Sequence, residues 1–286
     1  MLASVLMTGC LLAGAMTNVA GAQTLTRHRV GDPTVRIDVF GDSTAVSLAW
    51  GLAAKPLTAR YGYTLQNLGN LGCGVVDGPV VRFRGTYYLD HTECNGATPA
   101  PGAPLSAQPW PTQWQAAMAA DHPNVAVVLA GRWEIVDRVY NGAWTNILQP
   151  VYAQYVKRQL ELASNLITSA GANVIFMTAP CANEAKQPDG APYPESDPRR
   201  LAAYNRLVRQ VVAEHPKTDK LIDLAAVVCP GGKFVETYKG VDIRTADGIH
   251  FTQQAGVVLG SAFMPAIVDW GRAQIARTRA TTRSST

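Results

Sequence analysis

Hydrophobic residues in this chain form short continuous runs that alternate with longer amphipathic segments. Short runs rich in Val, Ile and Leu, such as "NVAVVLA", are typical of strands buried on both faces of a parallel sheet. The longer segments have the spacing of helices. We expect strands at 35–40, 64–67, 124–130, 173–180 and 220–224. We expect helices at 44–60, 113–120, 150–170, 198–214 and 253–272.

Strands that alternate with helices predict a mostly parallel sheet covered on both faces, because a parallel connection must cross over the sheet. The fold expected is therefore a three-layer α/β/α sandwich with about five strands. Residues 78–109 and 181–197 show no clear period and are expected to be loops. No linker divides residues 23–275, which predicts one domain, and the polar residues 276–286 are expected to be a disordered tail.

Composition narrows the possible partners. The chain is 47% hydrophobic and 16% charged, with a net charge of +4, and its Lys and Arg residues are scattered. Binding to nucleic acid needs a concentrated positive face, so no nucleic-acid partner is expected.

The N-terminus indicates export. Residues 1–22 are apolar, carry no charged side chain and end in Ala20-Gly21-Ala22, as before a signal-peptidase site. Because no Lys or Arg precedes the apolar run, three alternatives stay open: a start further upstream, a lipoprotein signal that uses Cys10, and an uncleaved membrane anchor. The expected location is secreted or associated with the cell envelope.

The remaining cysteines fit that location. Cys73, Cys94, Cys181 and Cys229 are an even number, and in an oxidising compartment they allow three connectivities. We favour Cys73 with Cys94 and Cys181 with Cys229, because each pair would tie a loop on the same side of the sheet. A zinc site is the weaker alternative, since the cysteines form no C-x-x-C pair, and no metal is expected.

Several distinctive residues follow the predicted strands: Ser43, Gly72, Gly131, Pro180 and, before the last helix, Asp247. Ligands of such sheets bind beyond the carboxyl ends of the strands, so these residues are candidates for one crevice. Ser43 opens the first helix and is either an N-cap or a nucleophile. Asp42 is expected to hold backbone N–H groups in the same turn.

A second motif supplies a base for Ser43. In "TADGIH", Asp247 and His250 are three residues apart, and a carboxylate that orients a histidine can activate a serine hydroxyl. Taken alone, the pair could equally be a helix-start carboxylate and a surface histidine.

Together, "FGDSTA" and "DGIH" resemble the first and last blocks of the SGNH (GDSL-like) hydrolase superfamily. The resemblance implies that Ser43 is the nucleophile, His250 the general base and Asp247 its orienting acid, with no cofactor. It also implies that Ser43 and Gly72, the latter in "NLGNLG", donate backbone N–H groups to an oxyanion hole.

The third block departs from the family, which usually has G-x-N-D. Here "AGRWE" places Trp133 at the Asn position and Glu134 at the Asp position. The third oxyanion donor is therefore Trp133, Arg132 or neither. This departure is similar to SGNH domains associated with acyltransferase-3 proteins, which implies a separate membrane acyltransferase as a partner.

Three functions follow as expectations. The first is an exported serine esterase acting on a small ester or an acylated carbohydrate. The second is an O-acyltransferase that uses the same triad to acylate a polysaccharide, and the third is an inactive carbohydrate-binding module. Four aromatic residues in or beside the long loop could stack on sugars or pack against the core: Tyr87, Tyr88, Trp110 and Trp114.

Overall fold

The fold is built on a five-stranded parallel sheet. The computed structural model describes residues 31–76, 80–89 and 108–284. The strand order is β2-β1-β5-β8-β9, and every neighbouring pair is parallel. The strands are β1 (Val35–Gly41), β2 (Tyr63–Asn67), β5 (Val125–Leu129), β8 (Asn173–Met177) and β9 (Asp219–Ile222). All five predicted strands are confirmed within a few residues.

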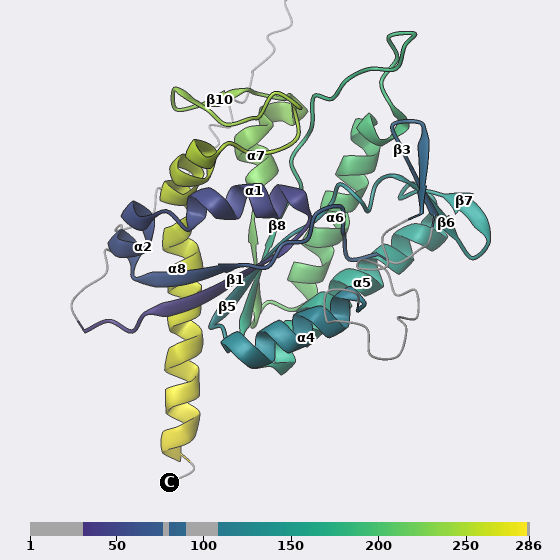
Figure 1. The fold of residues 1–286 in the computed structure, drawn as a ribbon. Coiled ribbons are helices and arrows are strands. Elements are labelled where there is room, and N and C mark those ends of the chain that lie inside the picture. The colour runs from purple at the N-terminus through teal and green to yellow at the C-terminus, as the bar shows by residue number, and fades with distance from the viewer. Residues whose placement is uncertain (1–30, 77–79, 90–107, 285–286) are drawn as a thin grey trace, which may run out of the picture.

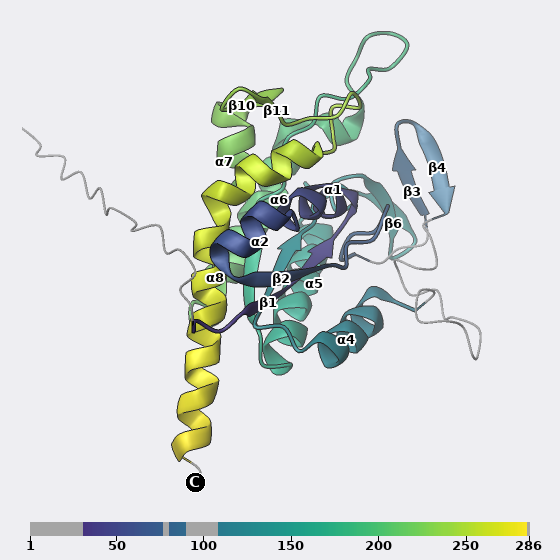
Figure 2. The same cartoon turned by 60° about the vertical axis from the view of Figure 1, so that its left-hand side comes forward.

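Helices cover both faces of this sheet, which confirms the three-layer sandwich (Figures 1 and 2). One face packs against α1 (Ser43–Leu52), α2 (Lys55–Tyr61), α7 (Leu224–Val228) and α8 (Gln253–Ser284). The other packs against α4 (Trp110–Asp121), α5 (Pro150–Ser169) and α6 (Pro198–Glu214). Two hydrophobic clusters, one on each face, fill the space between the layers, so the strand ends that carry the site are held from both sides.

The single helix expected at 44–60 is wrong, because the chain forms α1 and α2 with a break at Ala53 and Ala54. Pro56 explains the break. It has no N–H to donate to the Leu52 carbonyl, and its ring would clash with that group in a continuous helix. The Tyr63 hydroxyl instead donates to the Leu52 carbonyl, so the helix end remains satisfied.

The expectation of an uninterrupted loop at 78–109 is also wrong. This range contains two strands, β3 (Val80–Phe83) and β4 (Thr86–Leu89). They form an accessory antiparallel sheet with β6 (Asp137–Tyr140) and β7 (Ala143–Thr145), in the order β4-β3-β6-β7. Arg84 and Gly85 have φ of 50° and 72°, as in a tight hairpin turn. Figure 2 shows the β3–β4 hairpin standing out from the main body.

The segment between β9 and α8 holds a short antiparallel pair, β10 (Thr237–Tyr238) and β11 (Val241–Asp242). Two short 3-10 turns, Pro194–Ser196 and Pro230–Gly232, complete the connections.

The C-terminal end differs from the expected disordered tail. α8 continues to Ser284, and its last turns project beyond the body of the molecule (Figure 1). In that stretch the Thr281 and Thr282 hydroxyls donate to the Arg277 and Thr278 carbonyls one turn earlier, both at 3.1 Å. Within the described ranges, none of the helices has the length and hydropathy of a membrane span. The expected export signal, residues 1–22, lies outside the described residues.

Candidate active site

Ser43 lies at the junction of β1 and α1, and Asp42, not Ser43, caps the helix. The Thr44 N–H donates to Asp42 Oδ1 at 2.8 Å, and the Arg132 N–H donates to Asp42 Oδ2 at 3.2 Å. Asp42 is only 1% exposed, and its burial raises the pKa of its carboxyl. With the cap provided by Asp42, the Ser43 hydroxyl is available for another partner.

That partner is His250. Its Nε2 lies 2.8 Å from Ser43 Oγ, and its Nδ1 lies 2.5 Å from Asp247 Oδ2. The sequence separation of Ser43 and His250 is 207 residues, so the fold alone brings them together. A serine, a histidine and a carboxylate in this order have the geometry of a nucleophile, a base and an orienting acid.

The turn that carries Asp247 is organised around its carboxylate. Oδ1 accepts from the Thr245 hydroxyl at 2.6 Å and from the N–H groups of Ile249 and His250 at 2.9 and 3.1 Å. Partial burial would raise the pKa of Asp247, but these hydrogen bonds and the one from the His250 ring hold it well below its ordinary value. Asp247 is therefore ionised at neutral pH.

Gly72 belongs to the loop that follows β2. The Leu68 N–H donates to the Val39 carbonyl and the Asn70 N–H to the Gly41 carbonyl, both at 2.8 Å. The loop thus continues beside β1 up to the residues that precede Ser43. Gly72 has a φ of +77°, a left-handed conformation that favours glycine. The loop that carries this predicted oxyanion donor is therefore tied to the end of β1.

The guanidinium of Arg132 lies between two buried carboxylates. It forms ion pairs with Glu184 and Glu195, whose side chains are 1% and 2% exposed. Burial lowers the pKa of Arg132, and the two carboxylates act against this shift. The backbone N–H and the terminal guanidinium nitrogens of Arg132 have partners, but its Nε is buried without a hydrogen-bond partner among the described residues, so Arg132 stays an alternative for the third oxyanion donor.

Trp133 offers the other candidate donor, its indole N–H. Its Nε1 is shielded from solvent and has no hydrogen-bond partner among the described residues. The indole contacts the Phe83 ring of β3 at a centroid distance of 5.3 Å, which links it to the accessory sheet. A buried N–H without a partner costs free energy, so the indole N–H is available to an acceptor that a ligand could bring.

Glu134 connects the loop after β5 with the loop after β2, the two loops that carry the expected oxyanion donors Trp133 and Gly72. The sequence did not reveal this role. Glu134 is fully buried, and its Oε1 accepts from the Val75 N–H at 2.6 Å. A Cβ at Gly74 would lie 2.0 Å from the same oxygen, so only glycine fits there. Burial raises the pKa of Glu134 to about 7, and the nearby Asp42 adds to the rise.

The predicted Cys181–Cys229 disulfide is confirmed, with a Cα–Cα distance of 6.0 Å. Cys73 is also disulfide-bonded, but its expected partner, Cys94, lies outside the described residues. Among the described residues, no three His, Cys, Asp or Glu side chains gather as metal ligands would.

Arg244 braces the turn that carries Asp247 and His250, and sequence reasoning did not identify it. Its guanidinium donates to the Ile249 carbonyl at 2.8 Å and to the Cys181 carbonyl at 3.1 Å, so it joins the turn to the disulfide. Arg244 directly precedes the "TADGIH" segment, but a lone arginine gives no pattern from which this contact could be read.

Trp110 and Trp114 pack against the core. They are 3% and 7% exposed, and Trp114 stacks on Phe40 at a centroid distance of 4.5 Å. Of the two alternatives for these residues, the structure supports core packing. The side chains of Tyr87 and Tyr88 lie outside what the structure describes.

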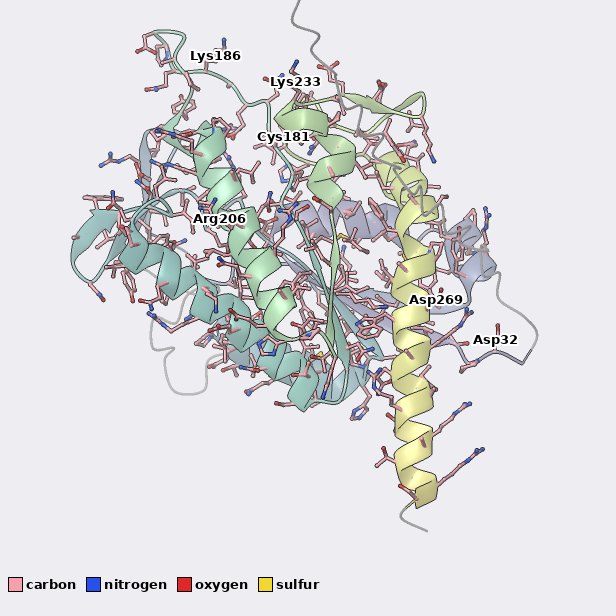
Figure 3. The ribbon with its side chains drawn as sticks, turned by 180° about the vertical axis from the view of Figure 1, so that it is seen from behind. Asp32, Cys181, Lys186, Arg206, Lys233 and Asp269 are labelled. Carbon is pink, nitrogen blue, oxygen red and sulfur yellow. A yellow bond between two sulfur atoms is a disulfide. The ribbon has the colours of Figure 1, made fainter. Side chains whose placement is uncertain are left out.

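A cleft of about 530 Å³ lies beyond the carboxyl ends of β5 and β8. Asp42 and Thr44, the chain neighbours of Ser43, line it, as does Ile249, the neighbour of His250. Of the five residues predicted for a shared crevice, Gly131 and Pro180 line it, whereas Ser43, Gly72 and Asp247 are not among its lining residues. The cleft then extends between α6 and α7. Figure 3 shows Cys181 on the segment that passes between these two helices.

A parallel α/β sandwich with a Ser-His-Asp constellation at its strand ends places the molecule in the hydrolase class of such folds. The family model described as the SGNH domain fused to AT3 domains matches residues 10–265. The chain belongs to this SGNH family, as its motifs predicted.

The fold is similar to that of a solved aryl esterase. An inhibitor-bound aryl esterase from M. smegmatis is 13% identical, with 83% of this chain and 100% of that chain covered and a TM-score of 0.51. A GDSL-like lipase from Bacteroides thetaiotaomicron is also 13% identical, with 85% and 92% covered and a TM-score of 0.48. A search of curated proteins returns no match.

Proposed function

We propose that this protein is an exported serine esterase that cleaves acetyl and similar esters, including those on carbohydrate of the cell envelope. The observation that carries the proposal is the unbroken hydrogen-bond chain from Ser43 through His250 to Asp247. A buried disulfide between Cys181 and Cys229 fits an oxidising compartment, which supports export.

In the proposed reaction, Ser43 Oγ attacks the ester carbonyl while His250 Nε2 takes the hydroxyl proton. The ionised Asp247 accepts a hydrogen bond from His250 Nδ1–H and stabilises the imidazolium that forms. His250 then gives its proton to the alcohol oxygen, which leaves. Water attacks the acyl-enzyme by the same route, releasing the acid and restoring Ser43.

The negative charge of the tetrahedral intermediate needs donors. We assign this role to the backbone N–H groups of Ser43 and Gly72 and to the indole N–H of Trp133. The helix start at Ser43 contributes the positive end of the α1 dipole. Trp133 thereby replaces the amide that the family usually provides, and the absence of another partner for its Nε1 supports this assignment.

Acyl transfer is the second candidate. If a sugar hydroxyl instead of water reaches the acyl-enzyme, the same triad acylates the sugar. Two observations favour this alternative: the description of the matching family, which names fusion to AT3 domains, and the open cleft whose lining includes Ile249, the chain neighbour of His250. A membrane acyltransferase would then be the partner that supplies the acyl group. Incubation with an activated acetyl ester and a glycan separates the two, since transfer yields acetylated glycan and hydrolysis yields free acetate.

The test of the main proposal is turnover of 4-nitrophenyl acetate by Ser43→Ala. We expect loss of turnover and of fluorophosphonate labelling, because no other group can replace the attacking oxygen. Ser284→Ala, at an exposed position in the last turn of α8, is the matched control and should behave as wild type. Full activity in Ser43→Ala would refute the assignment. A wild-type protein that neither turns over esters nor reacts with the probe would instead favour the inactive carbohydrate-binding module.

A further inference from the structure

Two consecutive residues, Asn183 and Glu184, contact the candidate site from two sides. On one side, the Asn183 N–H donates to the Gly248 carbonyl at 2.9 Å. A Cβ at Gly248 would lie 2.0 Å from the Asn183 carbonyl oxygen, so this close approach requires glycine. Gly248 belongs to the turn that carries Asp247 and His250, so Asn183 is fixed to the turn of the proposed base.

On the other side, Glu184 binds two arginines. Its Oε2 accepts from Arg84 Nε at 3.0 Å, and its Oε1 forms an ion pair with the Arg132 guanidinium. The side chain of Glu184 is 1% exposed, and that of Arg132 is 10% exposed. Because the Glu184 carboxylate is withheld from water, solvent screens its two ion pairs little. Each oxygen of one buried carboxylate therefore holds one guanidinium.

Both arginines adjoin the surroundings of Trp133. Arg132 precedes Trp133 in the chain, and Arg84 follows Phe83, the ring that contacts the indole. The guanidinium carbons of Arg84 and Arg132 each lie 5.1 Å from the centroid of the Phe83 ring. Glu184 thus acts on the indole from two directions, through the chain neighbour of Trp133 and through the ring that the indole touches.

An oxyanion donor stabilises the intermediate only when its N–H points to the place where the negative charge develops. A displacement of about 1 Å already lowers the rate of such a reaction substantially. We propose that Glu184 is a positioning residue, which holds the Trp133 indole in place relative to the turn that carries His250. Asn183 provides the connection to the turn, and Glu184 provides the connection to the indole. This inference rests on the proposed esterase function, because Glu184 acts through the oxyanion donor assigned to Trp133.

The test removes the charge of Glu184 and keeps the shape of its side chain. In Glu184→Gln, the Glu195 carboxylate remains 3.9 Å from the Arg132 guanidinium, so the arginine retains a partner and the loop is displaced rather than unfolded. For turnover of 4-nitrophenyl acetate we expect kcat to fall about tenfold, with KM within about twofold of wild type. Glu161→Gln removes a carboxylate from the Lys157 ion pair on α5, and this matched control should keep the wild-type kcat.

A double-mutant cycle separates positioning from a general structural role. The Trp133→Phe variant has no indole N–H, so its kcat does not depend on where that N–H lies. Adding Glu184→Gln to Trp133→Phe should therefore lower kcat by less than about twofold. An equal loss in both backgrounds would overturn the proposal, because Glu184 would then act independently of Trp133. So would a wild-type kcat in Glu184→Gln, or in Trp133→Phe, which would leave no donor to position.

A second variant covers the case in which Glu184→Gln does not fold. Arg84→Asn removes the other guanidinium from a side chain that is 35% exposed, and Asn tolerates the positive φ of 50° at this position. The backbone N–H of residue 84 still donates to Glu195. We expect kcat to fall at least about threefold in the wild-type background and to stay nearly constant in Trp133→Phe. No loss in the wild-type background, or an equal loss in both, would overturn the proposal.

Failure of the positioning role differs from failure of the proposed function. If Ser43 reacts with a fluorophosphonate and the wild-type protein hydrolyses 4-nitrophenyl acetate, the function stands whatever the cycle shows. If the wild-type protein does neither, the function and the positioning role are refuted together.

Discussion

The two halves of the candidate site differ most in their exposure to solvent. The attacking half, Ser43, His250 and Asp247, is open: the side chains of His250 and Asp247 are 31% and 39% exposed. The receiving half, Gly72, Trp133 and Glu134, depends on buried contacts, with Glu134 at 0% exposure and Trp133 Nε1 shielded. Glu134 therefore lies in the packed interior, whereas Gly72 and Trp133 are half-buried, as Ser43 and His250 are.

The largest effect is expected for Asp247→Asn, which tests the attacking half. Without the carboxylate, the His250 tautomer and its charged form lose their stabilisation, and kcat should fall by about 10³- to 10⁴-fold. Asp242→Asn, an exposed change in the same segment, should leave kcat unchanged. Steady-state kinetics measures both, and equal rates for the two variants would show that Asp247 does not orient the base.

Unfolding as a function of pH adds an independent readout on Asp247. Its folded-state pKa is lowered from the ordinary 3.8, so the ionised carboxylate stabilises the fold above that value. This stabilisation is lost as pH falls through the lower folded-state pKa. The difference in unfolding free energy between wild type and Asp247→Asn should therefore shrink below pH 3.8. If this difference in unfolding free energy grows as pH falls, the hydrogen bonds to the Asp247 carboxylate do not lower its pKa.

An intermediate effect is expected for Trp133→Phe, which removes the indole N–H and retains an aromatic ring. Loss of one oxyanion donor typically lowers kcat by about 10²- to 10³-fold. KM should change little, since the hydrogen bond forms mainly in the transition state. Trp144→Phe on β7 is the matched control and should keep the wild-type kcat. If Trp133→Phe is equally active, the receiving half has only two donors.

The smallest effect on rate is expected for Glu134→Gln, which keeps the shape of the side chain between the loops. Activity should stay within about tenfold of wild type, as for supporting residues that act through others. Stability is more informative. The pKa of Glu134 is raised from 4.5 to about 7, so the folded wild type holds a proton that the unfolded chain releases over this range.

The unfolding free energy of wild type should therefore decrease between pH 4.5 and about 7 relative to Glu134→Gln. Chemical denaturation across that range measures the slope. The exposed change Glu236→Gln should retain the wild-type slope. If Glu134→Gln retains it as well, the buried carboxylate is ionised throughout and its role between the loops needs another explanation.

The contrast between the attacking and the receiving half also explains which residues of the site could be predicted from the sequence. The residues of the attacking half could be named from the sequence because "GDS" and "DGIH" together resemble the first and last blocks of one family, whereas either motif alone is ambiguous. The main sheet was predictable because each buried strand is a local apolar run. The contact of Glu134 with Val75 joins residues 59 positions apart and has no local pattern.

The accessory sheet was missed although its hairpin has a local signal. Arg84 and Gly85 separate two short runs of strand-forming residues, which is a hairpin pattern. This pattern is hard to recognise because the surrounding region is rich in Pro and Gly. The replacement of the family's Asn by Trp133 was visible in the sequence. Its free Nε1, however, follows only from the packing against Phe83, which no one-dimensional pattern contains.

The central claim is that Ser43 forms a covalent acyl-enzyme within this site. The most direct measurement is peptide mass mapping after 4-nitrophenyl acetate is mixed with the protein and quenched with acid at early times. We expect an acetyl group on the peptide that contains Ser43, and none in Ser43→Ala. Turnover with acetyl on a different residue, or with no acylated peptide at any time, would contradict it.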